Sequence, residues 1–201
     1  ADSVSVSIDD DGDADTDPIV VSASKVGSAW VVDDVDLSTL TDGTITATVT
    51  VTDGAGNSGT STGTMTLDTA APTAPTAATG YGDNAGSVTS DTSTAATTDD
   101  TTPVLNIAKN ITDTVTLYVD GVSVASTYNS TAGTITPTAA VSVGVHDLRY
   151  TLTDAAGNES VQSAALRVTV DTAAPSVSIS TTAGTIKTGD ASVTITGTAI
   201  E

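Results

Sequence analysis

The chain has 201 residues, with 25 acidic residues against 5 basic ones and a formal net charge of −20 at pH 7. This charge excludes nucleic acids and anionic membrane surfaces as partners, because phosphate groups are bound by clustered Lys and Arg side chains. The absence of Cys excludes a disulfide framework and a thiolate metal site.

Composition also indicates the kind of core. Aromatic residues make up 2% of the chain and Phe is absent, so Val, Ile, Leu, Ala and the methyl groups of Thr must fill the interior. Such small side chains suit thin β-sandwiches of about 70–100 residues. No stretch has a helical period, no apolar run is long enough to span a membrane, and no signal peptide opens the chain. We therefore expect an all-β fold, with Ala1 and Glu201 as cuts inside a longer protein.

The first notable element along the chain is an acidic loop at residues 8–18, IDDDGDADTDP. Asp at alternate positions with a Gly for the bend can present several oxygens to one Ca²⁺, which takes about 6–8 oxygen ligands. The loop is not an EF-hand, because the Glu at the last loop position and the flanking helices are missing. The alternative is a solvated acidic loop. The candidate calcium ligands here are Asp9, Asp11, Asp13, Asp15 and Asp17.

The strand predicted at residues 44–52 opens an internal repeat. Its residues alternate strictly, with Ile, Ala and Val on one face and Thr on the other. A TDGAGN loop, a second strand and a DTAAP exit follow it, and the same order returns at residues 145–175 with TDAAGN and DTAAP. The inward positions predicted in the second copy are His146, Leu148, Tyr150, Leu152, Val168 and Val170.

The repeat also places turns and boundaries. Asp120 and Gly121 stand between two apolar alternating runs, which predicts a tight β-hairpin. The DTAAP exits predict domains at residues 1–72 and 73–175, with residues 176–201 as the start of a third, truncated repeat. Pro in each exit favours extended, semi-rigid joints.

Several of these pieces resemble one known family. TDGAGN, TDAAGN, both DTAAP exits, LYVDGVSV and the Asp-rich segment at residues 74–107 are similar to the bacterial Ig-like (BIg) repeats of giant RTX-type adhesins exported by type I secretion. The resemblance implies tandem seven-stranded Greek-key sandwiches in an elongated array, at the bacterial cell surface or outside the cell, with calcium at the joints. It also implies neighbouring repeats of the same chain as partners, and an unknown adhesion target bound by other domains.

The topology of such a sandwich predicts where ligands meet. The loop after the first strand and the end of the last strand share one pole, and the hairpin loop before the last strand lies at the opposite pole. We therefore expect Asp68, Asp154 and Asn158 to join the acidic loop in a composite calcium site at the first joint. The residues predicted for the second joint are Asp83, Asp91, Asp99, Asp100 and Asp171. The TDxAGN loops fit plain turns equally well, since Asp, Gly and Asn are ordinary turn residues.

The function predicted from these features is that of a non-catalytic, calcium-stiffened extender of a large secreted adhesin that serves cell adhesion or biofilm. His146 is the single histidine and lies on a strand, where we expect a structural role, and no nucleophile motif accompanies it. Trp30 is expected in the core or at a sheet edge. Two alternatives stay open: a module that binds a carbohydrate or protein ligand, and a surface-layer or sheath protein of a halophile, whose surfaces are also Asp-rich.

Overall fold

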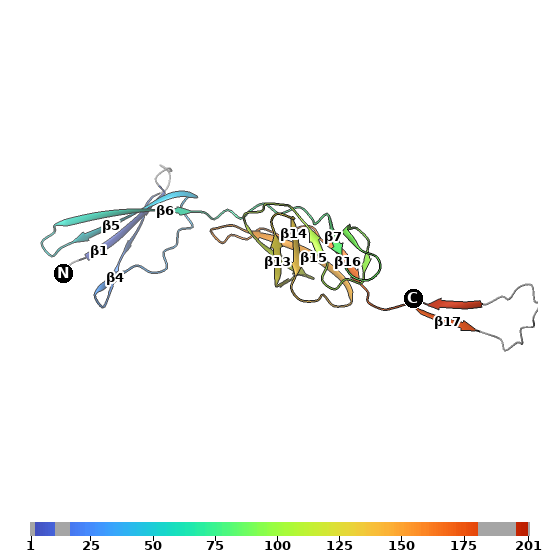
Figure 1. The fold of residues 1–201 in the computed structure, drawn as a ribbon. Coiled ribbons are helices and arrows are strands. Elements are labelled where there is room, and N and C mark those ends of the chain that lie inside the picture. Colours follow the sequence, from blue (N-terminus) through green and yellow to red (C-terminus); the bar gives the residue numbers. More distant parts are fainter. Residues whose placement is uncertain (1–2, 11–16, 181–195, 201) are drawn as a thin grey trace, which may run out of the picture. The chain divides into compact units, whose positions relative to one another are not determined.

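A computed structural model describes residues 3–10, 17–180 and 196–200. Asp11, Asp13 and Asp15 of the acidic loop lie outside the described residues. The described residues form eighteen β-strands and no helix, which confirms the all-β prediction (Figure 1). None of the described segments is therefore a helix that could cross a membrane. The backbone divides into a first unit of Ala1–Pro72 with Asp154–Asn158, and a second unit of Thr73–Thr153 with Glu159–Glu201.

The first unit is built on one antiparallel sheet with the order β2-β1-β5-β6. Cross-strand pairs place Val4, Val6 and Ile8 on the same face as the apolar residues of β5, and the Thr and Ser residues occupy the other face. A separate hairpin, β3–β4, follows β2. The strands are β1 (Ser3–Asp9), β2 (Ile19–Ser22), β3 (Ser24–Val26), β4 (Ala29–Val31), β5 (Gly43–Thr52) and β6 (Ser58–Leu67).

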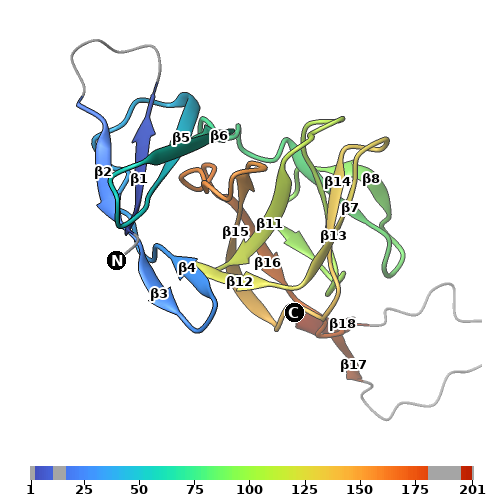
Figure 2. The same cartoon turned by 90° about the vertical axis from the view of Figure 1, so that its left-hand side faces the viewer.

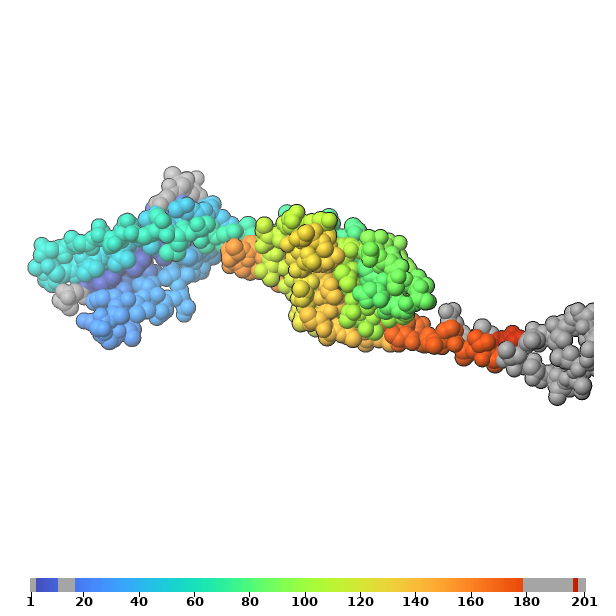
Figure 3. Space-filling model, in the orientation of Figure 1, coloured from blue at the N-terminus to red at the C-terminus, as the bar shows by residue number. Residues whose placement is uncertain are grey.

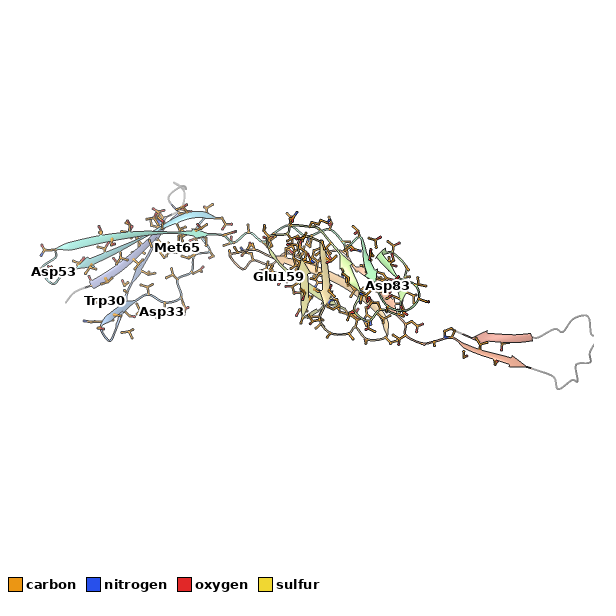
Figure 4. All side chains as sticks on the ribbon, in the orientation of Figure 1. Trp30, Asp33, Asp53, Met65, Asp83 and Glu159 are labelled. Carbon is orange, nitrogen blue, oxygen red and sulfur yellow. The ribbon has the colours of Figure 1, made fainter. Side chains whose placement is uncertain are left out.

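The core of the first unit is small. Only Ile8, Leu40 and Ile45 form its buried cluster among the described residues. Met65 pairs with Ile45 across β5 and β6, yet 53% of it is exposed. Trp30 is 38% exposed, with the Lys25 Nζ atom 5.8 Å from its ring centroid (Figure 4). One apolar face of this unit is therefore only partly covered.

The second unit is a sandwich of two five-stranded sheets (Figure 2). The first sheet has the order β13-β14-β10-β7-β8, and the second has the order β12-β11-β15-β16-β9. These strands are β7 (Gly80–Asp83), β8 (Ser90–Ser93), β9 (Thr97–Thr98), β10 (Val104–Asn106), β11 (Thr114–Val119), β12 (Val122–Val124), β13 (Ser126–Asn129), β14 (Thr134–Pro137), β15 (Gly144–Thr153) and β16 (Leu166–Val170). Within the described residues, all pairs are antiparallel except β9 with β16.

Both sheets of the second unit contribute to one core. Tyr81, Leu105 and Ile135 come from one sheet, and Leu117, Leu148 and Val168 from the other. Each of these side chains is at most 2% exposed. The inward positions predicted for Leu148, Tyr150, Val168 and Val170 are confirmed by their burial. After this sandwich, β17 (Ser176–Ser180) and β18 (Thr196–Ile200) form a two-stranded antiparallel pair.

The predicted hairpin at Asp120 and Gly121 is confirmed. β11 and β12 pair directly across it, and the two turn residues have φ values of 51° and 81°. Positive φ at both central positions is the geometry of a type I′ turn, whose twist matches that of the flanking strands. Asp120 tolerates this conformation better than most residues, and Gly121 has no Cβ to oppose it.

Gly121→Ala should therefore destabilise the second unit by about 1–2 kcal/mol, the usual cost of a left-handed conformation with a Cβ. No atom lies within 4 Å of the added Cβ, so the cost comes from the backbone alone. Denaturant unfolding measures the change in the free energy of unfolding, and hydrogen exchange shows whether β11 and β12 lose protection. The control is Gly59→Ala, whose site on β6 is equally open but lacks a positive φ. Equal effects of the two substitutions would contradict this account.

Candidate functional site

Three of the acidic residues predicted for the second joint line one cavity of the second unit. The cavity has a volume of about 310 Å³, and Asp83, Asp99 and Asp171 lie on its wall beside Thr98. The parallel pairing of β9 with β16 creates this arrangement, because it sets Val170 opposite Thr98. The Asp171 N–H donates to the Thr98 carbonyl at 2.8 Å, which fixes the end of β16 beside β9.

The Thr98 hydroxyl links the Asp83 carboxylate to the backbone of Asp100. It donates to Asp83 Oδ2 at 2.7 Å and accepts from the Asp100 N–H at 3.0 Å. Asp83 is 8% exposed and Asp100 is 3% exposed. The Thr102 N–H donates to Asp100 Oδ1 at 2.7 Å. Neither carboxylate pairs with a basic side chain, since the ion pairs between described residues involve only Asp120 and Asp147.

The Asp99 side chain occupies space that is left open by Gly86, which has no side chain. Gly86 has a φ of 63°, and a Cβ built there would collide with the Asp99 carboxylate. The loop between β7 and β8 thus makes room for this carboxylate by having no side chain at position 86. Asp91 lines a different cavity together with Asp83, and its carbonyl accepts from Asn106 Nδ2 at 3.1 Å.

The donor chemistry of this region fits Ca²⁺, which prefers carboxylate, hydroxyl and carbonyl oxygens. The spacing fits less well, because no three acidic or His side chains in the described part of the chain lie close enough together to ligate one metal ion. Calcium binding at Asp83, Asp91, Asp99, Asp100 and Asp171 therefore stays a prediction.

The acidic residues described in the first unit have mainly backbone partners. Asp10 is 7% exposed, and its Oδ2 accepts from the Thr41 N–H at 2.8 Å. Asp42 Oδ1 accepts from both the N–H and the hydroxyl of Thr69, at 2.9 and 2.8 Å. Asp9 ends β1, Asp17 precedes β2, and Asp68 Oδ1 accepts from the Ala70 N–H at 3.1 Å. Sequence reasoning missed Asp10, although one of two adjacent Asp residues at a strand end must point inward.

The two TDxAGN loops adopt the same self-capped turn. Asp154 Oδ1 accepts from the N–H groups of residues 156, 157 and 158, and its Oδ2 accepts from Asn158 Nδ2 at 3.0 Å. Asp53 makes the matching bonds to Ala55 and Asn57. Asn158 Nδ2 also donates to the Asp68 carbonyl at 3.0 Å. The structure thus brings Asp68, Asp154 and Asn158 together through turn chemistry, and their ligation of calcium stays a prediction.

His146 has structural partners on both ring nitrogens. Nδ1 lies 2.7 Å from Asp120 Oδ2, and Nε2 lies 2.9 Å from the Ser142 carbonyl. Asp120 also accepts from the Asp147 N–H at 2.8 Å. That backbone bond, together with the His146 contact, holds the pKa of Asp120 below its ordinary value. The histidine thereby ties the Asp120–Gly121 turn to β15.

The second unit consists of two sheets that face each other across one core. Their strands pair antiparallel, except for the short parallel pair of β9 and β16 at one edge. This arrangement is that of an immunoglobulin-like domain. Residues 73–172 match the family described as "Bacterial Ig-like domain". This segment is similar to that family, and the match confirms the immunoglobulin-like fold predicted from the sequence. No curated protein matches the chain.

Among solved structures, the chain is similar to one described as "Crystal structure of tetra-tandem repeat in extending region of large adhesion protein". The identity is 20%, the TM-score is 0.30, and the match covers 89% of this chain. It covers 44% of that chain, so the present sequence spans less than half of its length. A likeness at this level supports no conclusion about function.

The hydrogen bonds within the Asp154–Asn158 turn predict a measurable change in the titration of Asp154 when Asn158 is replaced. The side-chain amide of Asn158, helped by backbone N–H groups, holds the pKa of Asp154 below its ordinary value. Because the folded pKa is lower than the unfolded one, this carboxylate stabilises the fold above its unfolded pKa. That contribution is lost as the pH falls through the folded pKa. In ¹³C NMR titrations of the carboxyl carbon, Asn158→Ala should raise the midpoint of Asp154 and leave Asp53 unchanged. An unchanged Asp154 midpoint would contradict the assignment.

Proposed function

We propose that this chain is a calcium-stiffened extender in a large secreted bacterial adhesin. The observation that carries the proposal is the pair of buried carboxylates, Asp83 and Asp100, which lack a basic partner among the described residues of a chain with net charge −20. Burying an ionised carboxylate is costly unless it is paired or binds a metal. The similarity of residues 73–172 to the bacterial Ig-like family supports the proposal as a spacer scaffold.

The repeated architecture of the two units also supports a spacer role. The sheet order β2-β1-β5-β6 of the first unit matches the order β12-β11-β15-β16 of the second. The register matches as well, since Ser3 pairs with Thr52 in one sheet and Thr114 with Thr153 in the other. A chain that repeats one module gains length with each copy, which is the property a spacer needs.

Calcium would be held by oxygen ligands of the acidic residues at each joint. At one joint we propose the acidic loop with Asp68, Asp154 and Asn158, and at the other Asp83, Asp91, Asp99, Asp100 and Asp171. A bound Ca²⁺ supplies positive charge that offsets repulsion among these carboxylates. The protein's residues orient the oxygens, and the proline-containing exits limit bending at the joints. Calcium affinities of about 10⁻⁴–10⁻³ M suit an extracellular module.

The first experiment is a melting and small-angle scattering series of the full chain, in millimolar Ca²⁺ and in chelator. With Ca²⁺ at 10 to 100 times its Kd, binding to the folded state should add about 1.4–2.7 kcal/mol of stability. The thermal midpoint should rise accordingly, and the scattering should report a more extended particle. Asp83→Asn with Asp100→Asn should reduce the calcium-dependent rise, because this pair removes the buried charges.

The matched control replaces two exposed acids of the first unit, Asp33→Asn with Asp34→Asn, and removes the same charge. This control should retain the full calcium response. If neither the midpoint nor the scattering of the unmodified chain responds to Ca²⁺, calcium stiffening is wrong. The chain would then be a salt-adapted or ligand-binding sandwich.

A second prediction concerns the composite site. Asp68→Ala together with Asp154→Ala should lower the number of calcium ions bound per chain, as measured by isothermal titration calorimetry. Asp53→Ala is the control, because Asp53 makes the same turn bonds as Asp154 but lies outside the proposed site. An unchanged stoichiometry in the double variant, or an equal loss in the control, would remove these residues from the site.

A further inference from the structure

His146, the only histidine of the chain, is 9% exposed and contacts two different segments through its two ring nitrogens. Nδ1 lies 2.7 Å from Asp120 Oδ2 in the turn between β11 and β12. Nε2 lies 2.9 Å from the Ser142 carbonyl oxygen and 3.3 Å from the Ser142 hydroxyl, in the segment before β15. The hydrogen bonds that this ring can make therefore depend on which of its nitrogens carries a proton.

The contact at Nδ1 fixes the position of one proton. Asp120 Oδ1 accepts from the Asp147 N–H at 2.8 Å, and this bond, with the His146 contact, holds the pKa of Asp120 below its ordinary value. An ionised carboxylate can only accept a hydrogen bond, so Nδ1 must donate to it. When the ring is neutral, its single proton is therefore on Nδ1, and Nε2 is an acceptor.

The two contacts at Nε2 belong to different forms of the ring. A carbonyl oxygen only accepts, so the 2.9 Å contact with Ser142 requires a proton on Nε2 and hence a charged ring. The Ser142 hydroxyl, in contrast, can donate to Nε2 of the neutral ring. In the neutral ring the lone pair of Nε2 would face the carbonyl oxygen, and the two would repel each other.

Histidine is the only one of the groups around this ring that ordinarily changes charge near neutral pH. The next residue on β15 is Asp147, whose Oδ1 lies 4.0 Å from Arg167 Nη1 on β16. Residues 138–143 contain no titratable side chain, and the segment bonded to them carries Asp100, whose carboxylate accepts from a backbone N–H at 2.7 Å. Carboxylates ordinarily titrate below about pH 5 and Arg above about pH 12, whereas histidine changes charge between about pH 5 and 8.

The segment that carries Ser142 has room to move. Its Val141 is buried and donates its N–H to the Thr101 carbonyl at 2.7 Å, which anchors the segment. Val143 is 62% exposed, and Gly144 joins it to β15 with a φ of 134°. Figure 3 shows the chain from β13 to this segment (yellow to gold) on the surface of the second unit. The peptide group after Ser142 can therefore turn while the core stays in place.

We infer that His146 is a pH-dependent latch on the peptide group between Ser142 and Val143. The charged ring donates from Nε2 to the Ser142 carbonyl and holds the peptide in the orientation that the structure shows. When the ring loses this proton, Nε2 accepts from the Ser142 hydroxyl, and the carbonyl turns away. The Asp120 contact persists in both forms and keeps the ring in place. The latch lies within the second unit and needs no calcium, so it does not depend on the proposed function.

NMR of the ¹⁵N-labelled full chain, in the presence of a chelator, tests the latch. Both ring nitrogens should carry a proton at about pH 5, and only Nδ1 should carry one at about pH 8. The ring signals need no further assignment, because the chain has a single His. The three-bond HN–Hα coupling of Val143 reports its φ and not the nearby charge. This coupling should change with the same midpoint as the ring, because the peptide turns as the ring titrates.

Ser142→Ala removes the hydroxyl that binds the neutral ring and leaves the carbonyl in place. The titration midpoint of the ring should therefore rise by about 0.3–1 pH unit, the equivalent of one ordinary hydrogen bond. The matched control is Ser123→Ala on β12, because Ser123 is also exposed and lies outside the contacts of the ring, so the midpoint should not change. Asp120→Asn removes the negative charge beside Nδ1 and should lower the midpoint.

The amide spectrum of each variant shows that it is folded before its ring is titrated. The latch is overturned if Nε2 has the same protonation state at both pH values, or if the Val143 coupling does not follow the ring. It is also overturned if Ser142→Ala and Ser123→Ala have the same midpoint, because the hydroxyl then takes no part in the neutral form.

Discussion

The constraint on which this structure depends is that each sheet has one apolar face that must be covered. In the second unit the two sheets cover each other, and Leu117 and Leu148 meet Tyr81 and Leu105 in one core. Because aromatic residues make up only 2% of the chain, the side chains between the sheets each bury little area. Each strand of the facing sheet is therefore needed to cover the apolar face. In the first unit residues 35–40 cover only part of the same sheet. The difference in exposure between Met65 and its equivalent Val168 follows from this single fact.

The same packing places the acidic cluster where the apolar core ends. β7 belongs to one sheet and β9 to the other, so Asp83 and Thr98 meet at the edge of the sandwich. The hydroxyl and nearby N–H groups satisfy Asp83 and Asp100 as hydrogen-bond acceptors, and neither side chain forms an ion pair with a basic group among the described residues. Because burying a carboxylate is costly without a partner of opposite charge, this cluster is the physical reason for proposing calcium at the second joint.

Period-two alternation was sufficient to predict β5, β15 and β16, and the dipeptide at Asp120 was sufficient for its turn. The strands between Gly80 and Asn106 could not be predicted this way, because they are short and rich in Gly, Ser, Thr and Asp. Asp83, Asp99 and Asp171 line one cavity although they lie far apart in the sequence, and their ligation of calcium stays a prediction. The exposure of Trp30 was beyond sequence reasoning, since it depends on which strands face its hairpin.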